Sequence, residues 1–260
     1  MSGTSTDPIR LMTFDTVSVE VLPDAVSAKA RLAEHFASVA REVYAARGRF
    51  DVALAGGSTP QEAYALLAAP PYLKELPWSH VHVWFGDERC VPPDHPDSNY
   101  GMVRAQLLSR VAIPPEHVHR LAGERVPEEA AALYSAELGA AFGPRLPLRY
   151  AFDLVLLGMG GEGHTASLFP GSKVLGWEAP AAAPYVEKLG NPRLTLTPRA
   201  LNDARRVIFL VTGGGKAWAV RETLRSDRPW AEMPTRAIRP RAGRVTWILD
   251  PEAAAGLTES

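Results

Sequence analysis

The chain has 260 residues, of which 46% are hydrophobic, and its formal net charge at pH 7 is −1. This length and apolarity support a full buried core, which excludes a mainly disordered protein, and the single cysteine excludes an intrachain disulfide framework. The balanced charge and the lack of an apolar run of ~18 residues give no reason to expect nucleic acid or a membrane as a partner.

Segments typical of strands and helices alternate along the chain. Residues 17–21 alternate valine with polar residues, as a half-buried strand does, and residues 24–48 carry apolar side chains at helical spacing before a final glycine. Residues 50–55 predict a buried strand, after which Thr59 and Pro60 predict the cap and first turn of a helix. The later elements predicted in this way are strands at 81–85, 152–158, 193–197, 207–212 and 244–249 and helices at 98–108, 127–142 and 216–225.

This alternation predicts both a fold class and the place of a site. It favours an α/β fold, with a single domain over residues 1–260 built on a mainly parallel sheet that has helices on both faces. In such sheets, ligands bind outside the carboxyl ends of the strands. Four turns that follow predicted strands are rich in glycine or in charge, and they are the candidates for chemistry.

The turn LAGGSTP, at residues 54–60, joins a buried strand to a helix. Gly57 lets the backbone approach a ligand, Ser58 and Thr59 supply hydroxyl groups, and the helix start offers free N–H groups to a phosphate. A tight turn without a ligand is the alternative. Ser58 is disfavoured as a nucleophile, because Pro60 stands where the G-x-S-x-G elbow needs glycine.

The turn VTGGGKA, at residues 211–217, also looks like a phosphate loop. An NTPase is nevertheless disfavoured, because Ala217 replaces the Ser or Thr of the Walker pattern and its first glycine is absent. Lys216 either meets a phosphate as a point charge or is solvated. It lies in a basic stretch from Arg193 to Arg244, where twelve Lys and Arg residues face four Asp and Glu. We expect most of these cations to lie on solvated faces; the alternative is that one or two of them face a bound anion.

The turn GDERCVPPDHPDSN is polar. Asp87 and Arg89 follow a strand directly and are well placed for substrate contacts, unless they only pair within the loop. The Asp and His residues at 94–97 lack a recognised metal-ligand spacing. The H-x-H pairs at residues 80–82 and 117–119 have no evident third ligand, so we expect exposed histidines and no metal.

The turn GMGGEGHTASLFPG, at residues 158–171, contains G-x-G-x-x-G directly after a strand. A nucleotide-dependent oxidoreductase is the weaker interpretation, because its fingerprint needs a second strand ending in Asp or Glu about 20 residues later, and here Glu178 sits among prolines. His164 follows the last glycine of the turn. A histidine beside free backbone N–H groups suits a general base next to an oxyanion site, and a structural histidine is the alternative.

Five segments between residues 54 and 217 together resemble the 6-phosphogluconolactonase family: LAGGSTP, WFGDERCVPPDHPDSNYGMV, FDLVLLGMGGEGHTASLFPG, RLTLTP and GGGKA. The resemblance implies a modified Rossmann-like fold, as in glucosamine-6-phosphate deaminases and ribose-5-phosphate isomerases. It also implies hydrolysis of 6-phospho-D-glucono-1,5-lactone to 6-phospho-D-gluconate in the oxidative pentose phosphate pathway, with neither a metal nor an organic cofactor. One departure is Glu162 in GEGH, where the family often has Asp.

With this resemblance, the turns take on roles. His164 is the expected general base on water, and Asp87 and Arg89 orient the sugar. The expected phosphate cradle consists of Gly57, Ser58, Thr59, Arg193 and Lys216, and the expected oxyanion turn consists of Gly160, Gly161, Glu162 and Gly163. A deaminase-like isomerase is disfavoured, because Phe169 stands where those relatives carry a catalytic Glu; a sugar-phosphate-binding protein without catalysis is the other alternative.

The expected partner is the small-molecule substrate, 6-phosphogluconolactone, without nucleic acid or membrane. We expect a monomer or a weak homodimer. The lone Cys90 fits a reducing compartment and the first residues carry no apolar signal segment, so the predicted location is cytoplasmic.

Overall fold

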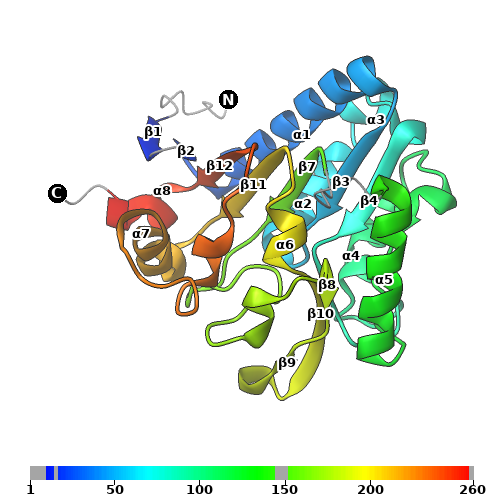
Figure 1. The fold of residues 1–260 in the computed structure, drawn as a ribbon. Helices are drawn as coiled ribbons and strands as arrows, with labels where there is room; N and C mark the ends of the chain where they lie inside the picture. The colour runs from blue at the N-terminus through cyan, green and yellow to red at the C-terminus, as the bar shows by residue number, and fades with distance from the viewer. Residues whose placement is uncertain (1–9, 15–16, 144–151, 258–260) are drawn as a thin grey trace.

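An eight-stranded sheet, in the order β1-β2-β12-β11-β7-β3-β4-β6, forms the centre of the computed structural model, which describes residues 10–14, 17–143 and 152–257 (Figure 1). Neighbouring strands are parallel except β1 and β2, which pair antiparallel at one edge. The predicted α/β fold with a mainly parallel sheet is thereby confirmed. The strands are β1 (Arg10–Phe14), β2 (Val17–Val21), β3 (Phe50–Leu54), β4 (Val81–Phe85), β6 (Val118–His119), β7 (Leu154–Leu157), β11 (Arg206–Val211) and β12 (Arg244–Leu249).

Helices cover both faces of this sheet (Figure 1). On one face, Phe36 of α1 packs edge-on against Phe50 of β3, with ring centroids 5.4 Å apart. Trp84 of β4 pairs with Ala53, three residues beyond Phe50, so its side chain points to the opposite face, where it packs against Tyr134 of α5. The helices are α1 (Ala25–Arg47), α2 (Ser58–Leu67), α3 (Tyr72–Glu75), α4 (Asn99–Val103), α5 (Pro127–Phe142), α6 (Pro198–Leu201), α7 (Ala217–Arg225) and α8 (Pro251–Ala254).

Short helical turns complete the connections. One of them continues α4 as a π-helical turn, η2 (Arg104–Leu108), so the helix predicted at 98–108 forms as two pieces. The 3₁₀ turns are η1 (Trp78–His80), η3 (Pro115–His117), η4 (Lys173–Gly176), η5 (Glu187–Leu189), η6 (Gly214–Lys216), η7 (Pro234–Ala237) and η8 (Ala255–Leu257). No helix among the described residues is long and apolar enough to cross a bilayer.

The helix ends follow the sequence signals with one exception. Gly48 closes α1 in the left-handed conformation, with a φ of 69°, and Ser98 caps α4 by accepting a hydrogen bond from the Gly101 N–H at 3.0 Å. The predicted cap at Thr59 is wrong: the cap position is Gly57, two residues earlier, whose φ is 94°, and α2 begins at Ser58. This positive φ turns the chain earlier and leaves the helix start without a side-chain cap.

A second, smaller antiparallel sheet lies beyond the carboxyl edge of the first. The strand predicted at 193–197 forms here rather than in the central sheet, because β4 runs on past Gly86 into a short strand that pairs with it. The pairing sets Arg193 directly opposite Arg89. Its strands are β5 (Asp87–Arg89), β8 (Ala181–Ala182), β9 (Tyr185–Val186) and β10 (Asn191–Leu196).

The edge strand β6, the turn η3 before it and the neighbouring β4 bring three histidines together. His82 of β4 stacks on His117 at 3.8 Å, and its Nδ1 lies 3.1 Å from Nε2 of His119. The expectation of exposed histidines is therefore wrong for these three, which are half-buried, and holds only for His80. Burial lowers the pKa of His82 to about 4, and the nearby Arg49 charge acts in the same direction.

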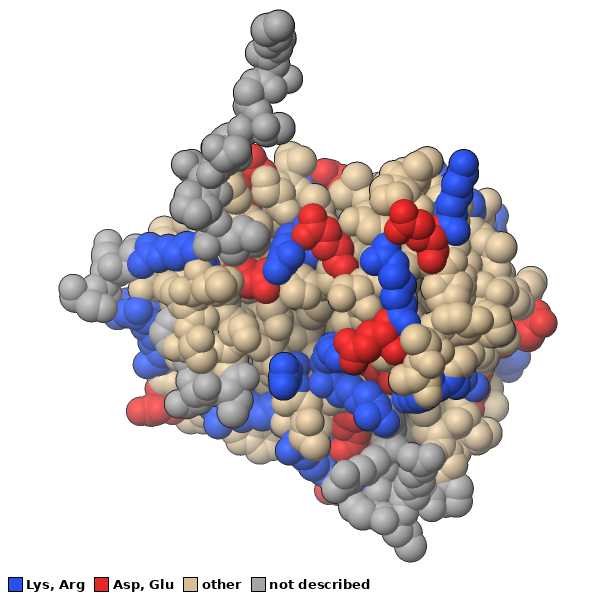
Figure 2. Space-filling model, turned by 90° about the horizontal axis from the view of Figure 1, so that it is seen from above, with Lys and Arg blue, Asp and Glu red and all other residues tan. Residues whose placement is uncertain are grey.

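Basic and acidic side chains pair over much of the surface. Arg206 donates to Glu42 at 2.6 Å, and Arg47 reaches the buried Asp153 at 2.6 Å. Figure 2 shows such mixing on one face, where blue and red side chains lie side by side. Arg206 therefore lies on a paired, solvated face, as we expect for most cations of the basic stretch.

The chain order reverses at the middle of the central sheet. From β3 the chain proceeds to β4 and β6 on one side, whereas from β7 it proceeds to β11 and β12 on the other. The carboxyl ends of β11, β7, β3 and β4 are therefore neighbours around a topological switch point. A ligand crevice is expected there, and all four turns singled out in the sequence follow these strands.

Candidate active site

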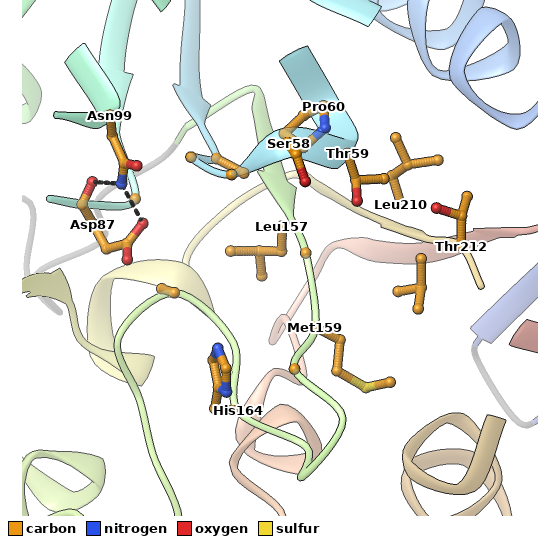
Figure 3. Close-up of a pocket in the computed structure, with 18 of the residues that line it drawn as sticks. Ser58, Thr59, Pro60, Asp87, Asn99, Leu157, Met159, His164, Leu210 and Thr212 are labelled. Carbon is orange, nitrogen blue, oxygen red and sulfur yellow. Dashed lines mark hydrogen bonds between the residues drawn. The ribbon is translucent and has the colours of Figure 1, made fainter. Parts of the chain in front are cut away.

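A cavity of 240 Å³ lies at this switch point, and residues of all four turns line it (Figure 3). The predicted site residues that line it are Gly57, Ser58, Thr59, Asp87, Arg89, Gly160, His164 and Lys216. Segments separated by more than 150 residues in the sequence thus converge on one cavity, as the functional interpretation requires.

The turn after β7 positions His164. The Thr165 hydroxyl donates to the Gly158 carbonyl at 2.8 Å, and the Gly160 N–H donates to the carbonyl of His164 at 2.8 Å. The imidazole stacks on Phe169, with ring centroids 4.2 Å apart. A Cβ on Gly160 would come within 2.1 Å of Nδ1 of His164, so only glycine allows the ring to lie over the backbone here.

Glu162 lies behind the histidine, on the side away from the cavity lining. Its Oε2 is 3.1 Å from the buried Nδ1 of His164, a contact that becomes an ion pair only when the imidazole is protonated. Burial alone would raise the pKa of Glu162, but the Lys188 ammonium, 2.5 Å from Oε1, and the His164 ring together lower it to about 2. Glu162 is therefore an anion at neutral pH, and Nε2 is the His164 nitrogen left for a ligand.

The electrostatics keep His164 neutral. Burial lowers its pKa, and this outweighs the opposite effect of the Glu162 and Asp87 carboxylates. The Lys216 charge lowers the pKa further. A neutral imidazole at neutral pH is the form that can accept a proton.

Asp87 is held by two side chains that sequence reasoning missed. It accepts a hydrogen bond from the Ser167 hydroxyl at 2.8 Å. It accepts another from Nδ2 of Asn99 at 3.1 Å (Figure 3). Burial raises the pKa of Asp87, and the Ser167 hydrogen bond and the Arg89 charge oppose this shift. A Cβ on Gly56 would come within 1.9 Å of Oδ1 of Asn99, so this glycine makes room for the amide.

Glu88, beside Asp87, has a structural task. Its buried carboxylate accepts hydrogen bonds from the N–H groups of Asn99 at 2.7 Å and Tyr100 at 2.8 Å. Arg89 donates to the Asp97 carbonyl at 2.5 Å, which holds the same loop. Among the described residues, no group of three or more His, Cys, Asp or Glu is arranged to hold a metal ion.

The two cations predicted to bind phosphate lie in different parts of the structure. Lys216 lines the cavity, together with Thr212, which sequence reasoning also missed. Arg193 does not line it; it lies opposite Arg89 in the smaller sheet and donates to Asn191. Burial and the neighbouring Arg89 charge lower the pKa of Arg193.

The predicted oxyanion turn is also divided. Gly160 lines the cavity, whereas Gly161, Glu162 and Gly163 lie outside its lining. The N–H groups of Gly160 and Gly163 donate within the turn, to carbonyl oxygens of the same segment. Among the described hydrogen bonds none uses the Gly161 N–H, which leaves this amide as the candidate donor.

Comparison with known proteins agrees with this geometry. A family model described as glucosamine-6-phosphate isomerases/6-phosphogluconolactonase matches residues 23–247. The chain is 40% identical to a 6-phosphogluconolactonase of Nostoc sp. over 93% of this chain and 98% of the relative, and 40% identical to that of Homo sapiens over 82% and 83%. The solved 6-phosphogluconolactonase from Trypanosoma cruzi superposes with a TM-score of 0.83 at 30% identity, covering 96% of this chain and 99% of that one. A monomeric glucosamine-6-phosphate deaminase, 20% identical with a TM-score of 0.78, shares the fold. The chain therefore belongs to the family of glucosamine-6-phosphate isomerases and 6-phosphogluconolactonases.

Proposed function

We propose that the chain is a 6-phosphogluconolactonase, which hydrolyses 6-phospho-D-glucono-1,5-lactone to 6-phospho-D-gluconate in the oxidative pentose phosphate pathway. The observation that carries the proposal is the neutral His164, backed by the Glu162 anion, in a cavity that also contains an uncapped helix start and Lys216. The relatives named 6-phosphogluconolactonase, at 40% identity over most of the chain, support it.

The substrate phosphate binds at the α2 side of the cavity. Gly57, Ser58 and Thr59 form the start of this helix, which has no side-chain cap, so its N–H groups remain for an anion. Lys216 lines the same cavity and supplies a positive charge. Arg193, outside the lining, adds positive potential beside Arg89.

The reaction needs one proton acceptor and one water molecule. Nε2 of His164 takes a proton from water as the oxygen attacks the C1 carbonyl carbon of the lactone. The carbonyl oxygen becomes an oxyanion, for which the Gly161 N–H is the proposed donor. When the intermediate collapses, the bond from C1 to the ring oxygen breaks, and the imidazolium returns its proton to that oxygen, which becomes a hydroxyl group.

Three polar residues orient this chemistry. Glu162 stays ionised and stabilises the imidazolium that forms on His164. Asp87 and Arg89, the first and last residues of β5, bind the sugar hydroxyls. Because Asn99 and Ser167 fix the Asp87 carboxylate, its orientation is set before the substrate arrives.

The isomerase alternative has less support. Phe169 stacks on His164 at 4.2 Å, at the position where the deaminase-like pattern carries a carboxylate. A ring-opening isomerase needs an acid or base there, and phenylalanine supplies none. The cytoplasmic location and the monomeric or weakly dimeric state remain predictions.

The test is a comparison of two substrates. Freshly prepared lactone is followed by acid release, and the spontaneous rate is subtracted; glucosamine 6-phosphate is followed by ammonia release. We expect saturable lactone hydrolysis and no ammonia. Ammonia release would favour the isomerase. If neither activity is detected, the non-catalytic binding protein becomes the favoured alternative.

A further inference from the structure

A second cavity, of 720 Å³, lies apart from the candidate active site and shares none of its lining residues. It lies between α6, the end of η4 and the segments around η7. Its volume is within the range of ~300–1,000 Å³ that is typical of small-molecule sites. Two tryptophans line it although both are half-exposed, Trp177 at 46% and Trp230 at 48%.

Arginines dominate the charge around this cavity. They belong to the basic stretch from Arg193 to Arg244 but are not among its cations assigned to the phosphate cradle. The charged lining residues are Arg199, Arg228, Arg236, Arg239, Arg241, Glu178 and Asp227. Five cations and two anions line the cavity. Carboxylates outside the lining also contact two of these cations: Glu222 and Glu232 pair with Arg228, and Asp203 lies 3.6 Å from Arg241.

Two of the arginines hold the loop that presents Trp230. Arg228 donates to Glu222 at 2.8 Å and to Glu232 at 3.1 Å, which joins both sides of the loop. Arg236 donates to the Thr223 carbonyl at the end of α7, at 3.0 Å. These hydrogen bonds hold the loop in place, so the exposed Trp230 indole lies on a fixed segment of the cavity lining.

Another two arginines lie on a segment that Asn202 clamps against α6. Nδ2 of Asn202 donates to the Ala237 carbonyl at 2.7 Å, and its Oδ1 accepts from the Arg239 N–H at 2.6 Å. Among the described residues, the exposed Arg239 guanidinium has no ion-pair or hydrogen-bond partner. The Arg241 guanidinium lies 3.6 Å from the Asp203 carboxylate. Both side chains line the cavity on a fixed backbone.

We propose that this cavity binds a nucleoside phosphate, with the base on the exposed indoles and the phosphates on Arg239 and Arg241. Indole rings offer flat apolar faces to a planar base, and guanidinium groups match phosphate oxygens in pairs. A sugar phosphate without a base would leave the tryptophans unused. The Arg239 guanidinium, unpaired among the described residues, disfavours a cationic aromatic ligand, and the two indoles favour an aromatic anion over a simple one.

The experiment is isothermal titration of the intact chain with ATP, adenosine and inorganic tripolyphosphate. We expect one saturable ATP site and weaker binding of both fragments. Trp230→Ala and Arg239→Glu should each weaken ATP binding at least about tenfold. The matched controls are Tyr185→Ala, a 58% exposed aromatic residue outside the cavity, and Arg110→Glu, which changes the charge equally; neither should alter binding.

Lys216→Ala separates this cavity from the phosphate cradle. It should leave ATP binding intact, while Trp230→Ala should leave lactone hydrolysis unchanged. The proposal is overturned if ATP shows no saturable binding, if tripolyphosphate or adenosine binds as tightly as ATP, or if Lys216→Ala abolishes binding that Trp230→Ala retains. Circular dichroism of each variant confirms that it is folded before its affinity is compared.

Discussion

Replacement of Gly160 by alanine tests how the turn holds the general base. The added Cβ would lie 2.1 Å from Nδ1 and 2.2 Å from Cε1 of His164, so the ring must move by about 1.3 Å to restore an ordinary contact. The φ of Gly160 is not positive, so alanine fits the backbone and the perturbation is steric. A displacement of ~1 Å in a catalytic group costs roughly 10²-fold in rate, and we expect that loss in kcat for Gly160→Ala.

The KM for the lactone should change little, because the phosphate cradle lies on the turns that follow β3 and β11. The free energy of unfolding should change by less than about 1 kcal/mol, since the methyl group displaces a partly exposed side chain. Gly215→Ala is the matched control: its Cβ would meet nothing within 4 Å. Initial rates on fresh lactone, corrected for spontaneous hydrolysis, provide the assay. Parental kcat in Gly160→Ala would refute the proposed position of the histidine.

Three further variants probe the phosphate, the pH dependence of rate and the pH dependence of stability. Lys216→Ala should raise KM by a factor equivalent to ~1.5–3 kcal/mol with little change in kcat, and an unchanged KM would place the phosphate elsewhere. Glu162→Gln removes a charge that favours the His164 imidazolium, so the pKa of His164 should fall further and the acid limb of the kcat profile should move to lower pH; a shift upward would contradict this. His82 is protonated near its ordinary pKa of 6.5 in the unfolded state, but only near 4 in the folded state. The free energy of unfolding should therefore fall as the pH drops from 6.5 to 4, by about 1–2 kcal/mol after allowance for solvent screening. Denaturant titrations of His82→Gln should lack this loss, and an equal loss would assign it to other groups.

The order of strands and helices was predictable because buried parallel strands are local signals. The run at residues 152–158 is apolar almost throughout, and β7 occupies Leu154–Leu157. The pairing of β10 with β5 was not predictable, since β5 has only three residues and meets β10 across about 100 residues of chain. Arg193 was therefore assigned to the phosphate cradle, although the smaller sheet places it beside Arg89 and outside the cavity.

The site residues that sequence reasoning missed have no local pattern. Asn99 and Ser167 act through Asp87, from positions 12 and 80 residues away, so only the folded chain reveals the contacts. His82 of β4 and His119 of β6 stack because those strands pair in parallel, which two H-x-H motifs do not predict. His164 was found because its neighbours, a buried strand and a glycine turn, are contiguous with it.

The most direct test of the central claim is kcat for lactone hydrolysis by His164→Asn. The variant keeps a polar side chain over the Gly160 turn but has no group that accepts a proton at neutral pH. We predict a loss of roughly 10²–10⁴-fold in kcat with a nearly unchanged KM, measured on fresh substrate with the spontaneous rate subtracted. A folded His164→Asn variant with near-parental kcat would contradict the account and would move the proton acceptor to Asp87 or Glu162.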